Sequence, residues 1–161
     1  MAYNPNFRQQ SGGGYGREPA PAPKPIVAMK IPDDFVDKAE QVMTFLAAEE
    51  QKDPRNNKHI TNTKIRKLFG LFTDLYNEIK REDAEELNPE QLQALTTARI
   101  RLVYECGRGG SGSDVFRFVR QANIQEYLKG IGNSRAEFLR FHQYFEALVA
   151  YHRYNFGEDK K

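Results

Sequence analysis

Cysteine and histidine are scarce in this 161-residue sequence, and tryptophan is absent. Because Cys106 is the single cysteine, no internal disulfide can form, and its place in an apolar helical pattern predicts a reduced, buried thiol. The histidines are His59, His142 and His152, and the last two fall on the apolar stripe of one expected helix. We interpret those two as core residues, and we expect neither a metal site nor a cofactor.

Long apolar runs and catalytic motifs are also missing. No run of about 18 apolar residues occurs, and the N-terminus has no hydrophobic signal core, so the sequence predicts a cytoplasmic protein without a membrane span. The G-x-S-x-G and H-E-x-x-H patterns do not occur. The paired acids fall at expected helix ends or in loops, where carboxylates are ordinarily solvated. We therefore expect no enzymatic activity and no catalytic residues.

The net charge is small, with a formal value of +2 at pH 7. Residues 1–30 carry four basic residues and one acidic residue, so the remainder of the chain sums to −1. A nucleic-acid surface would therefore have to come from clustering of cations on one face, because the bulk charge does not supply it.

The chain divides into three parts by composition. Residues 1–30 are rich in glycine, glutamine and proline, and cannot bury enough apolar surface to offset the entropy of ordering, so we expect a disordered tail. Residues 31–157 form the expected domain, and residues 158–161 a short charged tail. No segment of the domain alternates with a period of two.

Apolar residues of the domain recur with helical spacing, which predicts an all-α fold, a compact bundle of about five helices. Asp33 is the expected N-cap of the first helix, and Asn88, with a capping box to Gln91, that of the third. In the fourth, the apolar face changes near Asn123, which indicates a kink, a break or burial on two sides. The expected helices span residues 33–50, 60–81, 88–107, 113–131 and 134–157.

The second expected helix carries a cluster of cations at its start. Its apolar stripe stays within about 60° of one direction, while Arg66 and Lys67 lie well outside it and Lys64 lies at its border. A helix start with free N–H groups and three cations is a plausible contact for phosphate. The alternative is a surface helix with solvated Lys and Arg side chains.

Further cations fall on the polar sides of the next helices. Arg101 lies almost opposite the apolar stripe of the third helix, and Arg108 lies close to its end. Arg117 and Arg120 are three residues apart on the fourth, so they are spatial neighbours. If these faces meet, they form a basic strip suited to a sugar–phosphate backbone; if each cation pairs with a nearby acid, they do not. Both alternatives are open at this point.

Three stretches carry a resemblance to a known family. They are TNTKIRK (residues 61–67), LVYECGR (102–108) and FEALVAYHRY (145–154), of which the last is the most specific. In this order the segments resemble the small helical subunit of type III-A (Csm-type) CRISPR–Cas effector complexes, over about residues 33 to 157. The extended N-terminal tail is not part of that family's pattern.

The resemblance implies a five-helix, non-catalytic subunit that serves antiviral defence. Several copies would stack beside the backbone subunits that hold the guide RNA, and a basic face would line the path of the target RNA. Partners would be target RNA, the guide RNA–target duplex, other copies of the chain, and the backbone and large subunits. Matching motif positions are Lys64, Arg66, Lys67 and Arg108, to which the helical-face argument adds Arg101, Arg117 and Arg120. The alternative is a free-standing helical adaptor that binds a protein partner and not RNA.

Overall fold

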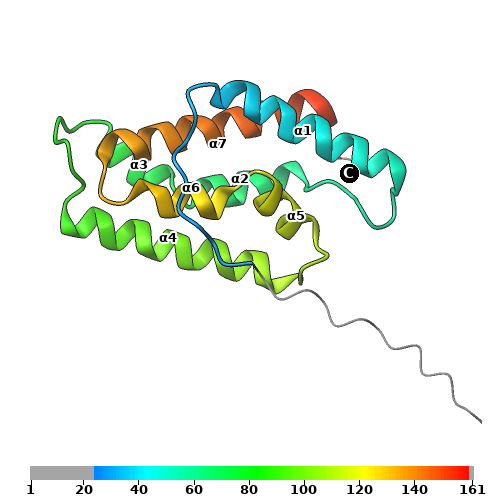
Figure 1. Ribbon diagram of the computed structural model, residues 1–161, viewed down its shortest axis with the longest axis horizontal. Helices are drawn as coiled ribbons and strands as arrows, with labels where there is room; N and C mark the ends of the chain where they lie inside the picture. The colour runs from blue at the N-terminus through cyan, green and yellow to red at the C-terminus, as the bar shows by residue number, and fades with distance from the viewer. Residues whose placement is uncertain (1–23, 160–161) are drawn as a thin grey trace, which may run out of the picture.

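The computed structural model describes residues 24–159, and within that range the chain forms helices and no strand (Figure 1). The predicted all-α class is therefore confirmed. The described part contains seven helices rather than about five, because two of the expected helices are each broken into two. They are α1 (Phe35–Lys52), α2 (Asn62–Gly70), α3 (Thr73–Ile79), α4 (Pro89–Arg108), α5 (Asp114–Gln121), α6 (Ile124–Ile131) and α7 (Arg135–Phe156).

The first break separates α2 from α3 by a tight turn. The amides of Leu71 and Phe72 donate to the carbonyls three residues earlier, at 3.2 and 3.1 Å, as in a 3₁₀ turn. Phe72 is fully buried, and its ring meets that of Phe141 on α7 edge-on, with centroids 5.1 Å apart. The apolar stripe thus continues across the turn, which explains why its periodicity gave no sign of the break.

The second break separates α5 from α6 at Asn123. This residue has a φ of 54°, in the left-handed region that ends a right-handed helix. The apolar face changes at the same place, so the discontinuity predicted near Asn123 is confirmed as a break. Ala122 lies beside it with its carbonyl accepting a 2.8 Å hydrogen bond from the buried hydroxyl of Tyr144.

Helix α7 is the centre of the core. It packs against α1, α2, α3 and α6, and α4 lies along the opposite edge of the molecule, where it contacts α3 and α5 (Figure 1). Its phenylalanines Phe138, Phe141 and Phe145 are fully buried. Burying each phenyl ring stabilises the fold by roughly 2–3 kcal/mol, so α7 supplies a large share of the core's stability.

Several helices begin or end where the sequence predicts, whereas the start of α1 and the end of α4 differ from the prediction. The capping box of α4 is present, with Gln91 N donating to Asn88 Oδ1 at 2.8 Å and Asn88 N to Gln91 Oε1 at 3.0 Å. The N-cap position of α1 is Asp34 rather than the expected Asp33, and its side chain forms no capping hydrogen bond. The carboxylate of Asp33 accepts from Arg140 at 2.9 Å instead. Helix α4 continues to Arg108, one residue beyond the expected stop.

Residues 24–30 belong to the expected disordered tail, yet the structure holds most of this segment against α6. Met29 N donates to Glu126 O at 3.0 Å, and the ammonium groups of Lys30 and Lys129 donate to backbone carbonyls across the contact, each at 2.8 Å. Gly130 permits the approach, since a Cβ there would lie 1.8 Å from Met29 O. One backbone hydrogen bond and two lysine–carbonyl bonds hold this segment, and amino-acid composition does not predict such contacts. Residues 1–23 lie outside the described range.

The two histidines expected in the core are buried, as is Cys106. His142 stacks on Tyr76, and a ring nitrogen of His152 hydrogen-bonds to Ile60 O. Within residues 24–159, no group of three or more metal-ligating side chains could hold a metal ion. None of the described helices is long and apolar enough to cross a membrane.

Candidate nucleic-acid interface

A groove of about 210 Å³ lies where α2, the end of α4 and the start of α5 meet. Three of the cations singled out in the sequence line it, namely Lys64 and Lys67 from α2 and Arg108 from α4. The two lysines reach the groove because Ile65 and Leu68 anchor α2 in the core and leave the lysines on its outer side, while Arg108 reaches it from the last turn of α4. We call these three cations and the surface between them the α2/α4/α5 groove.

Two acids pair with these cations. Asp114 Oδ2 lies 2.8 Å from Lys64 Nζ, and Glu105 lies between the other two, 3.3 Å from Lys67 Nζ and 3.5 Å from Arg108 Nη1. The lysines and Arg108 remain more than half exposed, so these pairs are screened by water and contribute little to stability. The groove therefore keeps a net positive charge of one.

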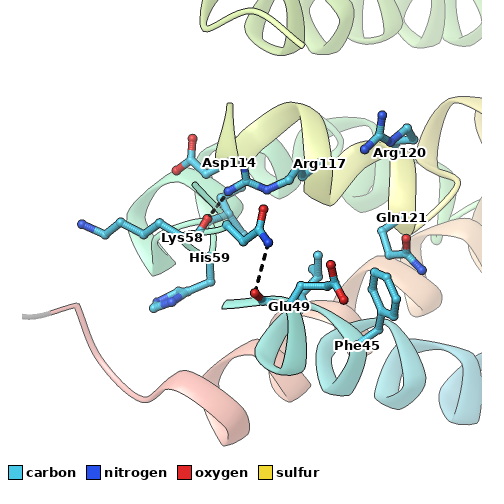
Figure 2. A pocket seen from close by; sticks show the side chains of 11 residues that line it. Phe45, Glu49, Lys58, His59, Asp114, Arg117, Arg120 and Gln121 are labelled. Atoms are coloured by element: carbon cyan, nitrogen blue, oxygen red, sulfur yellow. Dashed lines mark hydrogen bonds between the residues drawn. The ribbon is translucent and has the colours of Figure 1, made fainter. Parts of the chain in front are cut away.

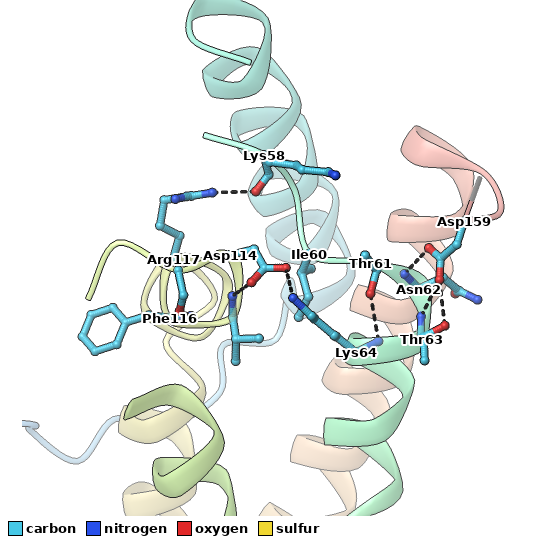
Figure 3. A network of polar contacts seen from close by, with 12 residues as sticks. Lys58, Ile60, Thr61, Asn62, Thr63, Lys64, Asp114, Phe116, Arg117 and Asp159 are labelled. Carbon is cyan, nitrogen blue, oxygen red and sulfur yellow. Dashed lines mark hydrogen bonds and ion pairs between the residues drawn. The ribbon is translucent and has the colours of Figure 1, made fainter. Parts of the chain in front are cut away.

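Asp114 is held in place by the start of α5 (Figure 3). Its Oδ1 accepts from Val115 N at 2.9 Å, and Ser113 Oγ accepts from Phe116 N at 3.1 Å, so both side chains satisfy amides of the first turn. A carboxylate is favoured at this end of a helix by the positive end of the helix dipole. Asp114 thus directs Lys64 across the groove as a fixed counter-ion.

The N-terminus of α2 already holds an anion of the protein itself. Asp159 accepts from Asn62 N at 2.6 Å and from Thr63 N at 2.9 Å, while Thr61 Oγ1 caps Lys64 N at 3.2 Å (Figure 3). The bonds to Thr63 and then Asn62 lower the pKa of Asp159 below its usual value. The amides that the sequence made available to a phosphate are therefore occupied, and only the side chains of α2 remain open.

A second hollow, of about 200 Å³, lies between the end of α1, the α1–α2 connection and α5 (Figure 2). Arg117 and Arg120 line it, together with Phe45 and Lys58. The guanidinium of Arg117 donates to the carbonyls of residues 56, 58 and 112, at 2.5–2.7 Å. It fastens the α1–α2 connection to the start of α5, a structural role that helical periodicity did not reveal. Arg120 is exposed, with its guanidinium carbon 5.8 Å from the centre of the Phe116 ring.

Arg66 and Arg101 are exposed and line neither hollow. Like Arg120, they form no ion pair with any residue between 24 and 159. Arg101 precedes Arg108 by seven residues, or about two turns, so both lie on the same side of α4. Among residues 24–159, three of the seven cations are therefore ion-paired, three have no acidic partner and Arg117 binds carbonyls.

The acids of the groove were not singled out in the sequence. Glu105 could have been found, because it precedes Arg108 by three residues and such pairs are neighbours on a helix. Asp114 is 50 residues from Lys64, and no sequence signal joins them. A buried thiol borders the site: Cys106 has its pKa raised to about 11, mainly by burial and further by the charge of Glu105, so it stays protonated and unreactive.

Comparison with known proteins gives one consistent family. The model of the type III-A Csm2 family matches residues 32–158. A CRISPR system Cms protein Csm2 from Mycobacterium tuberculosis (strain H37Rv) is 37% identical over 131 residues, which cover 81% of this chain and 98% of that protein. The protein of the same name from Streptococcus thermophilus is 34% identical over 133 residues, covering 83% of this chain and 100% of that protein. These matches span nearly the whole helical domain, and this chain therefore belongs to the Csm2 family, the small subunits of type III-A Csm complexes.

Proposed function

We propose that several copies of this chain stack along a type III-A effector complex and line the path of the target RNA through contacts to its sugar–phosphate backbone. The observation that carries the proposal is the convergence of Lys64, Lys67 and Arg108 on the α2/α4/α5 groove. Arg66, Arg101 and Arg120 do not line this groove, but they are exposed and form no ion pair within the described part, so their charges would be available to further phosphates. Arg117 would act by holding the loop beside α5 in place.

Backbone contacts suit the task of such a subunit. A guide-directed complex must accept any target complementary to its guide, and contacts to phosphate and sugar carry no sequence information. The subunit itself would be non-catalytic, and its partners would be target RNA, the guide–target duplex, further copies of itself, and the backbone and large subunits.

The charge balance of the groove predicts weak binding by one copy. Each cation of the groove has an acid beside it, and a phosphate must compete with that acid. Isolated affinity should therefore be poor and sensitive to salt. Stacked copies would present many such grooves to one strand, and the weak contacts would add through high effective concentration.

The test replaces Lys64, Lys67 and Arg108 together with Ala in the reconstituted complex and measures target binding over a salt series. Losing three phosphate contacts per copy should weaken binding for two unrelated guide–target pairs alike. The slope of the logarithm of the binding constant against the logarithm of the salt concentration (the salt slope) should fall in magnitude by about 2 for each copy that contacts the RNA. The melting temperature should hardly change, because these pairs are exposed.

The matched control removes the same charge elsewhere, by replacing Lys38, Lys52 and Arg55, which are exposed on α1 and the connection after it. If the control and groove variants lose the same RNA affinity, the effect comes from net charge and not from the groove. Unchanged affinity and slope in the groove variant would remove the groove from the RNA path and favour the protein-binding adaptor. A loss for one target alone would contradict backbone recognition.

A further inference from the structure

A strip of apolar side chains on α4 faces solvent. Ile100, Val103 and Tyr104 are spaced three and four residues apart, so they adjoin on the helix surface. Their exposed fractions are 65%, 49% and 66%, and α4 forms one edge of the molecule (Figure 1). These three side chains form a small contiguous apolar patch, and such exposed patches can mark contact surfaces.

Arginines border this strip on the side of the groove. Arg101 precedes Tyr104 by three residues and Arg108 follows it by four, so both are neighbours of the tyrosine on the helix. From Gln91 to Tyr104 the helix carries no acidic residue. The nearest acid on α4, Glu105, points toward Lys67 in the groove, where the two form an ion pair. The tyrosine ring therefore lies beside a row of cations that leads into the α2/α4/α5 groove.

We propose that Tyr104 is a stacking platform for an unpaired base of the RNA whose phosphates contact Arg101 and Arg108; this rests on the proposed function. An aromatic side chain beside a cationic track is the arrangement by which proteins bind single-stranded nucleic acid without sequence preference, since every base has a π-face. Stacking would thus add affinity to the groove without adding sequence specificity.

Unpaired RNA fits this strip better than a protein partner does. A stable protein interface buries about 800 Å² on each side and draws on some 20–30 residues. The apolar strip has three, and the exposed residues one turn earlier, Thr96 and Thr97, are polar. A base with its phosphate needs only one ring and one or two cations, and Tyr104 with its flanking arginines supplies those.

The experiment titrates the full-length protein at low salt with an unstructured oligouridine that carries one 2-aminopurine, and with an abasic oligomer of the same length. Three variants separate the properties of the side chain: Tyr104→Phe keeps the ring, Tyr104→Leu keeps only apolar bulk, and Tyr104→Ala removes both. The control is Tyr154→Leu, because Tyr154 is 84% exposed and lies on α7, no residue of which lines the groove.

The Leu and Ala variants should bind oligouridine roughly tenfold more weakly and lose the change in 2-aminopurine fluorescence. The Phe variant and the Tyr154 control should behave as the wild type. For the abasic oligomer, all variants should be equal to the wild type, because it offers no base to stack. The salt slope should be the same throughout, since no charge is altered.

Several outcomes would overturn the assignment. One is that Tyr104→Leu binds oligouridine as tightly as the wild type, which would show that an apolar side chain is enough and that no ring stacking is needed. Another is loss of copies from the reconstituted complex in Tyr104→Ala, seen by native mass spectrometry, which would make the strip a protein interface. If the Tyr104 substitutions have no effect on binding while the Lys64, Lys67 and Arg108 substitutions weaken it, the stacking proposal is wrong and the proposed function is retained. If the Tyr104 substitutions weaken binding while the three groove substitutions do not, the groove is not part of the RNA site, but stacking on Tyr104 is retained.

Discussion

The rings of Tyr76 and His142 lie face to face, with centroids 3.6 Å apart and planes inclined by 2°. This stack joins α3 to α7 at the edge of the aromatic core. The ring of Phe69 lies there too, with its centroid 4.8 Å from that of His142. Burial, with a smaller effect of the Lys80 charge, lowers the pKa of His142 to about 4. Within residues 24–159 its Nδ1 has no hydrogen-bond partner, and with a pKa this low the imidazole is neutral at pH 7.

Acid should destabilise the protein through His142. The unfolded chain binds the proton at a pKa near 6.5 and the folded chain only near 4, so the free energy of unfolding falls as the pH drops through this window. The loss from this residue should reach roughly 2–3 kcal/mol at pH 4. Urea unfolding between pH 7.5 and pH 4 measures it. In His142→Phe the decrease of unfolding free energy that comes from this residue should vanish. An unchanged dependence on pH would show that His142 is not the group responsible.

Core packing predicts unequal effects at two phenylalanines. Phe145 is fully buried, with its ring 5.2 Å from that of Phe69, whereas Phe69 is only partly buried. Phe145→Ala should cost about 3–5 kcal/mol, and Phe69→Ala about 1–3 kcal/mol, because less apolar surface is lost there. Denaturant unfolding of both variants provides the comparison. Losses below about 1 kcal/mol at both sites would mean that the apolar face is wrongly placed.

Gly130 should control whether the N-terminal segment stays on α6. A Cβ at this position would lie 1.8 Å from Met29 O and 2.6 Å from Met29 C, so Gly130→Ala should displace residues 26–30. Trypsin should then cleave after Lys30 much faster than in the wild type, as followed by mass spectrometry. Gly107→Ala is the control, since a Cβ there meets nothing within 4 Å. Equal cleavage rates in all three proteins would count against the contact.

Glu105 should restrain the groove, because it pairs with both Lys67 and Arg108. Replacing it with Gln keeps its size and releases two cations, so target RNA should bind the reconstituted complex more tightly and with a steeper salt slope. Glu146→Gln, an exposed position on α7, removes the same charge away from the groove. An equal gain in the control would show a general charge effect, and a loss of affinity in Glu105→Gln would show that the acid positions the cations.

Much of the fold could be predicted because the information is local. The capping box of α4 lies within one turn, between Asn88 and Gln91, so its residues are recognisable from their spacing. The apolar stripe of α7 appears as spacing along the chain, and the left-handed residue at Asn123 coincides with a visible change of face. The break after Gly70 could not be predicted, since the turn preserves the stripe on both sides of it.

The sequence by itself determined which residues are cations on polar helix faces, and the motifs that identify the family. Only the tertiary structure decided what each cation does. Lys64 meets an acid 50 residues away, and Arg117 meets carbonyls about 60 residues away, at distances set by how α1, α2 and α5 pack. Arg66 and Arg101 have the same sequence character and stay free in the described part of the chain. Charge pairing acts through space over a few ångströms, so helical periodicity, which reports only the side of one helix, cannot contain it.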